Sequence, residues 1–482
     1  MRILYLDLDT LRPDHLSCYG YHRETSPNID WIASQGVRFN NCYASDVPCL
    51  PSRSAFYSGR LGIHNGAVNH GGTSADIKLE GTNRGFRNSP DRLPWMGCLN
   101  RDGIYPVSIS PFAERHSSWH FCAGFREQYN TGKGGLEIAD DVTPVALDWI
   151  DRNADRDDWF LQVNYWDPHT PYRTPEEYGN PFADQPARPF PDEETIQRDY
   201  RSYGPHSAHE PGGYGREDMS KWPRIPDEIR NREDYVRWID GYDVGIKYMD
   251  DHIGRLLEAF ENQGVLDDLV IIVSSDHGEN QGELNVYGDH QTADNVTCRV
   301  PMIVRWPGIA EPRVDDGLLY QVDLAATSVE LLGGRVPARW DGQSFADAFR
   351  AGQDCGRDYL VVSQCAWSCQ RAARWGDYIL IRTYHDGLKD YPEIMLFDVI
   401  NDPHETHNLA DERPELVAQG MAALEQWHGD MMATSDDAID PLWTTMREGG
   451  PLHTRGELTS YCERLRATGR EDCAEALEAR HG

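Results

Sequence analysis

The chain has 482 residues and a formal net charge of -33, from 79 Asp and Glu against 46 Lys and Arg. This length predicts about two to four domains around a large core, and 39% hydrophobic residues are typical of a globular protein. A surface this acidic argues against binding to nucleic acid or to anionic membranes, since both require basic patches.

Strand and helix signals alternate over the first 350 residues. Apolar runs predict strands at residues 3–8, 159–165, 269–274 and 300–305, and amphipathic runs predict helices at 26–34, 142–152, 235–263 and 322–332. Strands separated by helices form βαβ units. We therefore expect residues 1–350 to form an α/β domain with a large, mostly parallel sheet flanked by helices.

The pattern changes near residue 350. Short runs at 359–363, 378–384 and 395–399 predict a small antiparallel sheet, and residues 457–480 predict a terminal helix. We assign residues 351–482 to a smaller C-terminal α+β subdomain. Its last helix could pack against a partner subunit in a homo-oligomer or against its own chain.

Residues 175–226 form a long insertion that is rich in Pro, Gly and charge and has little periodicity. A connection of this length is usually functional or disordered. The segment could be a surface insertion, or a lid whose rings stack on sugar or aryl groups. The side chains that would do this are Tyr203, His206, His209 and Trp222.

Several features predict a cytoplasmic protein. The chain enters a strand at once, without a signal-peptide pattern, and no apolar run approaches the about 18 residues of a membrane span. The eleven cysteines are scattered and odd in number, so a complete disulfide framework within one chain is excluded.

Acidic and imidazole side chains follow two of the predicted strands. Asp7 and Asp9 end the first strand and share one face of it, and Asp276 and His277 follow the strand 269–274. Sites in doubly wound sheets form at the carboxyl ends of strands. Either pair alone could be turn carboxylates, but together they predict a site for a divalent cation.

A third segment is Cys49-Leu-Pro-Ser-Arg53, followed by Ser58-Gly-Arg60. It resembles the C-x-P-S-R…G-R signature of the formylglycine-dependent (type I) sulfatases, in the alkaline phosphatase superfamily. Segments at residues 9–20, 26–39, 167–172, 275–279, 299–303 and 396–409 resemble the same family in the same order. The resemblance implies that a maturation enzyme oxidises Cys49 to formylglycine, whose hydrated aldehyde is the nucleophile.

The resemblance also implies one divalent cation, held by Asp9, Asp276, His277 and residue 49, with calcium as the family's usual metal. The residue after Asp9 is commonly a second Asp in the family and is Thr10 here. Asp7 could supply the missing carboxylate or be a buried structural acid. His277 stands where Asn is common, and its imidazole suits manganese or zinc better than calcium.

Further departures concern the groups that bind the anion and protonate the alcohol. The family's G-K-x-H stretch is absent after residue 103, and a late Lys is replaced near His290. Arg53 would stabilise the charge on the sulfate, and an imidazole suits the general acid, with His169 as first choice and His290 as second. Substitutes for the absent Lys and His are Ser108, Ser110, Arg115 or His116, and Arg84 and Arg87 could read a second anionic group.

These motifs predict a sulfuric ester hydrolase that acts on a sulfated small molecule or saccharide. A phosphonate monoester or phosphodiester hydrolase of the same superfamily is the alternative, because such enzymes share the Asp-His pair. A binding protein that has lost turnover is a third hypothesis, since the usual Lys and His are missing.

Overall fold

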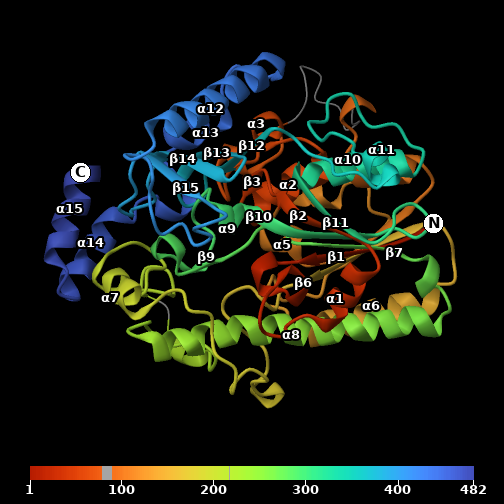
Figure 1. Cartoon of the computed structure of the whole chain (residues 1–482), viewed down its shortest axis with the longest axis horizontal. Helices are drawn as coiled ribbons and strands as arrows, with labels where there is room; N and C mark the ends of the chain where they lie inside the picture. The colour runs from red at the N-terminus through yellow and green to blue at the C-terminus, as the bar shows by residue number, and fades with distance from the viewer. Residues whose placement is uncertain (79–89, 217) are drawn as a thin grey trace.

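The computed structural model describes residues 1–78, 90–216 and 218–482. A large sheet lies at its centre (Figure 1). It has eight strands in the order β11-β2-β10-β7-β1-β6-β4-β5. The strands are β1 (Arg2–Leu8), β2 (Val37–Tyr43), β4 (Tyr105–Ile109), β5 (Glu127–Tyr129), β6 (Trp159–Tyr165), β7 (Val270–Ser274), β10 (Arg299–Arg305) and β11 (Arg313–Tyr320). Only β10 runs antiparallel to its neighbours. The predicted α/β class with a large, mostly parallel sheet is confirmed.

Alternate residues of β1 enter two separate cores. Ile3 and Tyr5 pack on one face with α2 (Cys49–Ser58), α4 (Trp95–Arg101) and α10 (Gln321–Leu331). Leu4 and Leu6 pack on the other face with α1 (Pro27–Ser34), α6 (Ala139–Asn153) and α8 (Arg232–Asn262), which Figure 1 shows crossing below the sheet. Since side chains alternate along a strand, Asp7 points to the face of α2.

A smaller sheet has the order β15-β14-β13-β12-β3. Its strands are β3 (Asp46–Val47), β12 (Tyr359–Gln364), β13 (Cys369–Trp375), β14 (Tyr378–His385) and β15 (Ile394–Asp398). The last four are antiparallel, as expected, and β3 pairs in parallel with β12. Because β3 directly precedes α2, this sheet supports the start of the helix that carries Cys49. The division of the chain at residue 350 remains a prediction.

The remaining elements are short or lie near the C-terminus. They are α3 (Gly62–Asn65), α5 (Phe112–Arg115), α7 (Glu193–Arg201), β8 (Asn280–Gln281), β9 (Tyr287–Asp289), α9 (Asn295–Cys298), α11 (Ala346–Ala351), α12 (Pro414–Thr434), α13 (Pro441–Arg447), α14 (Leu458–Ala467) and α15 (Glu471–His481). The single terminal helix predicted at 457–480 is therefore two helices. Gly469, with a left-handed φ of 77°, lies between them.

The insertion 175–226 contains a helix, α7, which the sequence did not predict. The Asp192 side chain caps it by accepting a hydrogen bond from the Thr195 amide at 2.8 Å. The following loop lies beside α14 and α15 (Figure 1). Its Tyr203 joins a small core with Tyr461. The C-terminal helices thus pack against their own chain.

No helix in the described ranges is long and apolar enough to cross a membrane. All eleven cysteines are free.

Candidate active site

Three elements bring four side chains together at one end of the large sheet. Asp9 follows β1, Asp276 and His277 follow β7, and Cys49 is the first residue of α2. One potential ligand atom from each lies within 4.8 Å of the others. All four residues are buried. The structure therefore joins the two strand-end motifs and the Cys49 segment into one cluster.

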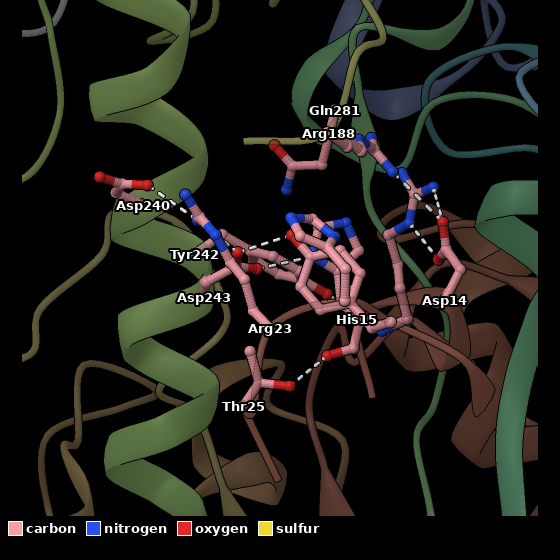
Figure 2. Close-up of polar contacts among 12 residues, drawn as sticks. Asp14, His15, Arg23, Thr25, Arg188, Asp240, Tyr242, Asp243 and Gln281 are labelled. Carbon is pink, nitrogen blue, oxygen red and sulfur yellow. Dashed lines mark hydrogen bonds and ion pairs between the residues drawn. The ribbon is translucent and has the colours of Figure 1, made fainter. Parts of the chain in front are cut away.

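The loop after Asp9 is held by α8. The His15 Nδ1 atom lies 2.7 Å from one oxygen of Asp243, and Arg23 donates to the other at 2.8 Å (Figure 2). The Tyr242 hydroxyl donates to the Thr10 carbonyl at 2.8 Å. One helix thus fixes the backbone on the C-terminal side of Asp9.

A second set of ion pairs holds the same loop from the opposite side. Arg12 pairs with Asp14 at 2.6 Å and with the buried Glu283 at 3.1 Å. Arg188, from the insertion, pairs with Asp14 at 3.2 Å (Figure 2) and with Glu283 at 3.2 Å. The insertion therefore helps to position the loop that follows Asp9.

Arg53 lies one helical turn after Cys49 and faces three carboxylates. It pairs with Asp7 at 2.9 Å and with Asp9 at 3.1 Å, and it contacts Asp276. Asp7 also accepts a hydrogen bond from Gln162 at 2.8 Å and lies outside the four-residue cluster. Of the two alternatives for Asp7, the structure favours the buried structural acid.

The electrostatics of the cluster suit a divalent cation. Three buried carboxylates contact the one guanidinium of Arg53, so the acidic groups outnumber the cation that they face. Apart from its ion pair with Arg53, Asp9 has no hydrogen-bond partner for either oxygen among the described residues. Burial and the charge of Asp276 raise the pKa of Asp9. A bound cation would give the oxygens of Asp9 a partner and would favour the ionised form of this carboxylate.

The orientation of His277 also suits a metal ligand. Its Nδ1 atom lies 2.8 Å from the Gly278 carbonyl, so this nitrogen carries the proton. Its Nε2 atom keeps a lone pair and lies 3.1 Å from the sulfur of Cys49 and 3.3 Å from Asp276. In metalloproteins, a hydrogen bond from the ring nitrogen that does not bind the metal orients the histidine ligand in this way. The residues present therefore fit a cation with carboxylate and imidazole ligands.

The cluster does not activate the thiol of Cys49. Burial, and then the charges of Asp9 and Asp276, raise the pKa of this thiol well above its usual value. A protonated thiol is a weak nucleophile. In the free protein, an unmodified Cys49 is therefore a protonated thiol and a weak nucleophile.

Both histidines considered as general acid lie beside the cluster. The His290 ring centre is 4.1 Å from that of His277 and 5.9 Å from that of His169. His169 contacts the Thr170 carbonyl through Nδ1. Burial lowers the pKa of both histidines, so they are neutral in the free protein.

A cavity of about 440 Å³ begins at His169 and Asp289. Its walls come from the insertion, from α8 and from the C-terminal part of the chain. The residues that line it are His169, Thr170, Pro171, His206, Pro211, Gly212, Gly213, Tyr214, Arg216, Met219, Trp238, Asp289, Trp367 and His453. Of the two histidines considered as general acid, His169 lines this cavity and His290 does not.

Arg115 is the best placed of the four proposed substitutes for the family's Lys and His. Its guanidinium lies 5.0 Å from the centre of the Trp166 ring and donates to the Gly134 carbonyl at 3.3 Å. It forms no ion pair with a carboxylate in the part of the chain described. Its charge partly offsets the burial that raises the pKa of Asp9 and Cys49, and it adds to the burial that lowers the pKa of His169. Arg115 therefore lies within electrostatic reach of the cluster.

The other substitutes have different neighbours. Ser108 and Ser110 donate hydrogen bonds at 2.8 Å to Gln162 and Asn164. His116 packs against His70, with ring centres 4.9 Å apart. Arg84 and Arg87 lie outside the described residues.

Sequence reasoning missed several residues around the cavity. His70 and His453 are 383 positions apart, yet a nitrogen of one lies 2.9 Å from a nitrogen of the other. No spacing in the sequence signals such a pair. Of the four insertion residues considered, only His206 lines the cavity. Tyr203 packs on α14, His209 stacks on Tyr200, and Trp222 packs against the core below the sheet.

Comparison with known proteins identifies the family. The sulfatase family model matches residues 2–334, and a model for the C-terminal region of N-sulphoglucosamine sulphohydrolase matches residues 282–427. An N-acetylglucosamine-6-O-sulfatase from Bacteroides thetaiotaomicron is 23% identical over 471 residues, which cover 84% of this chain and 82% of the relative.

Two solved structures share the fold. One, in complex with its substrate D-glucosamine-2-N,6-O-disulfate, has a TM-score of 0.70 at 20% identity and covers 90% of this chain and 99% of its own. The other, a phosphonate monoester hydrolase from Silicibacter pomeroyi, has a TM-score of 0.68 at 18% identity and covers 90% and 96%. Because the sulfatase model covers most of its length, the chain belongs to the sulfatase family of the alkaline phosphatase superfamily, a family of sulfuric ester hydrolases.

Proposed function

We propose that the protein hydrolyses the sulfate ester of a saccharide or another small molecule at residue 49 and releases sulfate and an alcohol. The observation that carries this proposal is the buried cluster of Asp9, Asp276 and His277 around Cys49, with Arg53 against it. The likeness to an N-acetylglucosamine-6-O-sulfatase supports a saccharide as the alcohol part.

We propose two groups that the site acquires before it is active. A divalent cation held by Asp9, Asp276, His277 and residue 49 would supply positive charge to the sulfate oxygens. Calcium is the usual metal of the family, whereas the imidazole of His277 supports manganese or zinc. Formylglycine, made from Cys49 by a maturation enzyme, would supply the attacking hydroxyl. The eleven free cysteines support a cytoplasmic location.

The arginines of the site bind the anion. Arg53 is held in place by Asp7 and lies against the cluster, where it can donate to sulfate oxygens as negative charge moves onto them. Arg115 approaches from the side of α5 and has no carboxylate to compete with the substrate in the described ranges. Two guanidiniums and one cation would replace the lysines found in other members.

His169 protonates the departing alcohol in this proposal, and His290 is the second choice. Burial keeps both imidazoles neutral in the free protein. A bound sulfate ester adds a negative charge nearby, which raises the pKa of an imidazole and lets it carry the proton. His169 lines the cavity where the alcohol would lie, whereas His290 lies deeper, beside His277.

A phosphonate monoester or phosphodiester hydrolase is the second candidate. His277 favours it, because the Asp-His pair is shared with such enzymes. The fold itself is compatible with both activities, since solved structures of both kinds are similar to this chain.

The test compares matched aryl esters of sulfate, phosphodiester and phosphonate with purified wild type and Cys49→Ala, at several metals. We expect sulfate release by the wild type and its loss in Cys49→Ala. Faster hydrolysis of the phosphodiester or phosphonate would overturn the sulfatase proposal and favour the second candidate. No release from any ester by protein whose residue 49 is converted would favour a binding protein.

A further inference from the structure

We infer that the 440 Å³ cavity binds one neutral pyranose unit, the alcohol part of the sulfate ester, and that Trp367 and His453 determine this specificity. The inference rests on the proposed function. It adds a subsite that depends on residue 453, which lies beyond the regions matched by either family model.

The burial of the cluster bears on where the alcohol part of the ester lies. Asp9, Cys49 and His277 are each 1% exposed or less, so the alcohol part of a bound ester needs a cavity beside the cluster. His169 lies at that boundary, between His290 and the cavity. A leaving oxygen beside His169 would therefore carry its alcohol part into the cavity.

The walls of the cavity combine rings with hydrogen-bonding edges. Trp367 stacks on His453, with ring centres 4.5 Å apart and planes at 23°, and His206 stands edge-on to Trp367 at 5.3 Å. The Tyr214 hydroxyl donates to the His453 carbonyl at 3.0 Å. A pyranose offers apolar C–H faces that match such rings.

The charges of the cavity are already paired. Arg216 forms an ion pair with Glu457 at 2.6 Å, and His206 lies 2.8 Å from Asp289. Burial lowers the pKa of His453 to about 4, so this imidazole is neutral at neutral pH. Since the charged lining residues have partners, a second sulfate or a carboxylate on the sugar would lose its hydration without gaining a partner. The walls therefore favour a neutral sugar.

The size and the rigidity of the cavity favour a single unit. Ligand pockets of about 300 to 1,000 Å³ hold molecules of sugar to drug size, and 440 Å³ lies near the lower end. The insertion wall is fixed by α14, because the Tyr461 hydroxyl accepts a hydrogen bond from the Gly204 amide at 2.7 Å. Arg470 also donates to the buried Glu210 at 3.1 Å. The insertion wall is therefore held in place around a cavity of this size.

The test measures binding by calorimetry in the Cys49→Ala protein, which cannot turn the ester over. We expect hexose 6-sulfate to bind at least about 10-fold more tightly than glucosamine 2-N,6-O-disulfate. Adding Trp367→Ala should lower the affinity for hexose 6-sulfate by about 10- to 200-fold, the usual effect of one lost pocket contact. Trp367→Phe should restore most of the affinity, and the affinity for inorganic sulfate should change less than about 2-fold.

The matched control is Trp443→Ala, because Trp443 is 45% exposed and lies outside the cavity. Tighter binding of the disulfate, no binding of hexose 6-sulfate, or equal losses for sulfate and hexose 6-sulfate in Trp367→Ala would overturn the inference. Normal binding together with no ester hydrolysis by converted wild type would instead contradict the proposed function alone.

Discussion

His169 and His290 lie at different distances from the cavity, and this difference can be tested. A general acid matters most when the departing alcohol is a poor leaving group. We expect His169→Ala to lower kcat for a sugar sulfate by about 100- to 10,000-fold, but to affect 4-nitrophenyl sulfate far less. The measurement is kcat for both esters with each variant. The assignment would be wrong if His169→Ala lowered kcat equally for the two esters while His290→Ala lowered it mainly for the sugar sulfate. That result would identify His290 as the general acid.

Arg115 is expected to bind the sulfate group. Loss of a charged hydrogen bond is worth about 1.5–3 kcal/mol, so Arg115→Ala should lower kcat/KM for any sulfate ester by about 10- to 150-fold. Arg115→Lys should recover part of this, because it keeps the charge but not the planar geometry. The exposed Arg350→Ala is the control. An unchanged kcat/KM in Arg115→Ala would show that Arg115 does not contact the anion.

Some site residues could be predicted from the sequence because strand ends converge. Asp9, Asp276 and His277 follow strands that become neighbours in the sheet, so their meeting needs only the parallel topology. Asp7 could not be told from Asp9, because both share one face and only the position of Arg53 separates their roles. His453 comes from a distant loop, which local sequence patterns do not place.

At the scale of elements, Asp243 on α8 supports the loop that carries Asp9. Removing one partner of a buried ion pair costs about 3–5 kcal/mol, because the other charge stays buried and unpaired. We expect Asp243→Ala to lower the free energy of unfolding by about this amount. Denaturant titration measures it, with the exposed Asp148→Ala as control. A loss no larger than the control's would mean that Arg23 and His15 find other partners.

Strongly periodic elements were predicted, and strands with mixed composition were not. The predicted limits of α6, α8 and β6 agree with the structure to within a few residues, since apolar spacing sets both their packing and their pattern. β11 contains two Asp and a Gly, and β2 contains two Asn, so neither resembles a strand locally. They form because neighbouring strands supply hydrogen bonds and a core.

At the scale of the whole molecule, lowering the pH has opposite effects on stability at two buried groups. Burial lowers the pKa of His116 to about 3 and raises that of Asp167 to about 7. Their unfolded values are about 6.5 and 3.9. As pH falls below 6.5, the unfolded chain takes up the proton of His116 first, so this group costs stability. As pH falls from 7 to 4, folded Asp167 takes up its proton first, so this group adds stability.

Two variants separate these effects. Relative to His116→Phe, the free energy of unfolding of the wild type should fall by about 1.4 kcal/mol per pH unit as the pH falls from 6.5 to 4. Relative to Asp167→Asn, the free energy of unfolding of the wild type should rise by the same amount per pH unit as the pH falls from 7 to 4. Denaturant unfolding at each pH gives both differences. Slopes of the same sign for both variants would contradict the assignment.

The central claim is that residue 49, as an oxidised cysteine in a metal cluster, carries the hydrolysis. The most direct measurement is the mass of the peptide that contains residue 49, together with sulfate release, in protein made with and without a maturation enzyme. The account predicts an aldehyde in place of the thiol, and sulfate release in proportion to the converted fraction. Full sulfate release from protein in which Cys49 is entirely an unmodified thiol would contradict it.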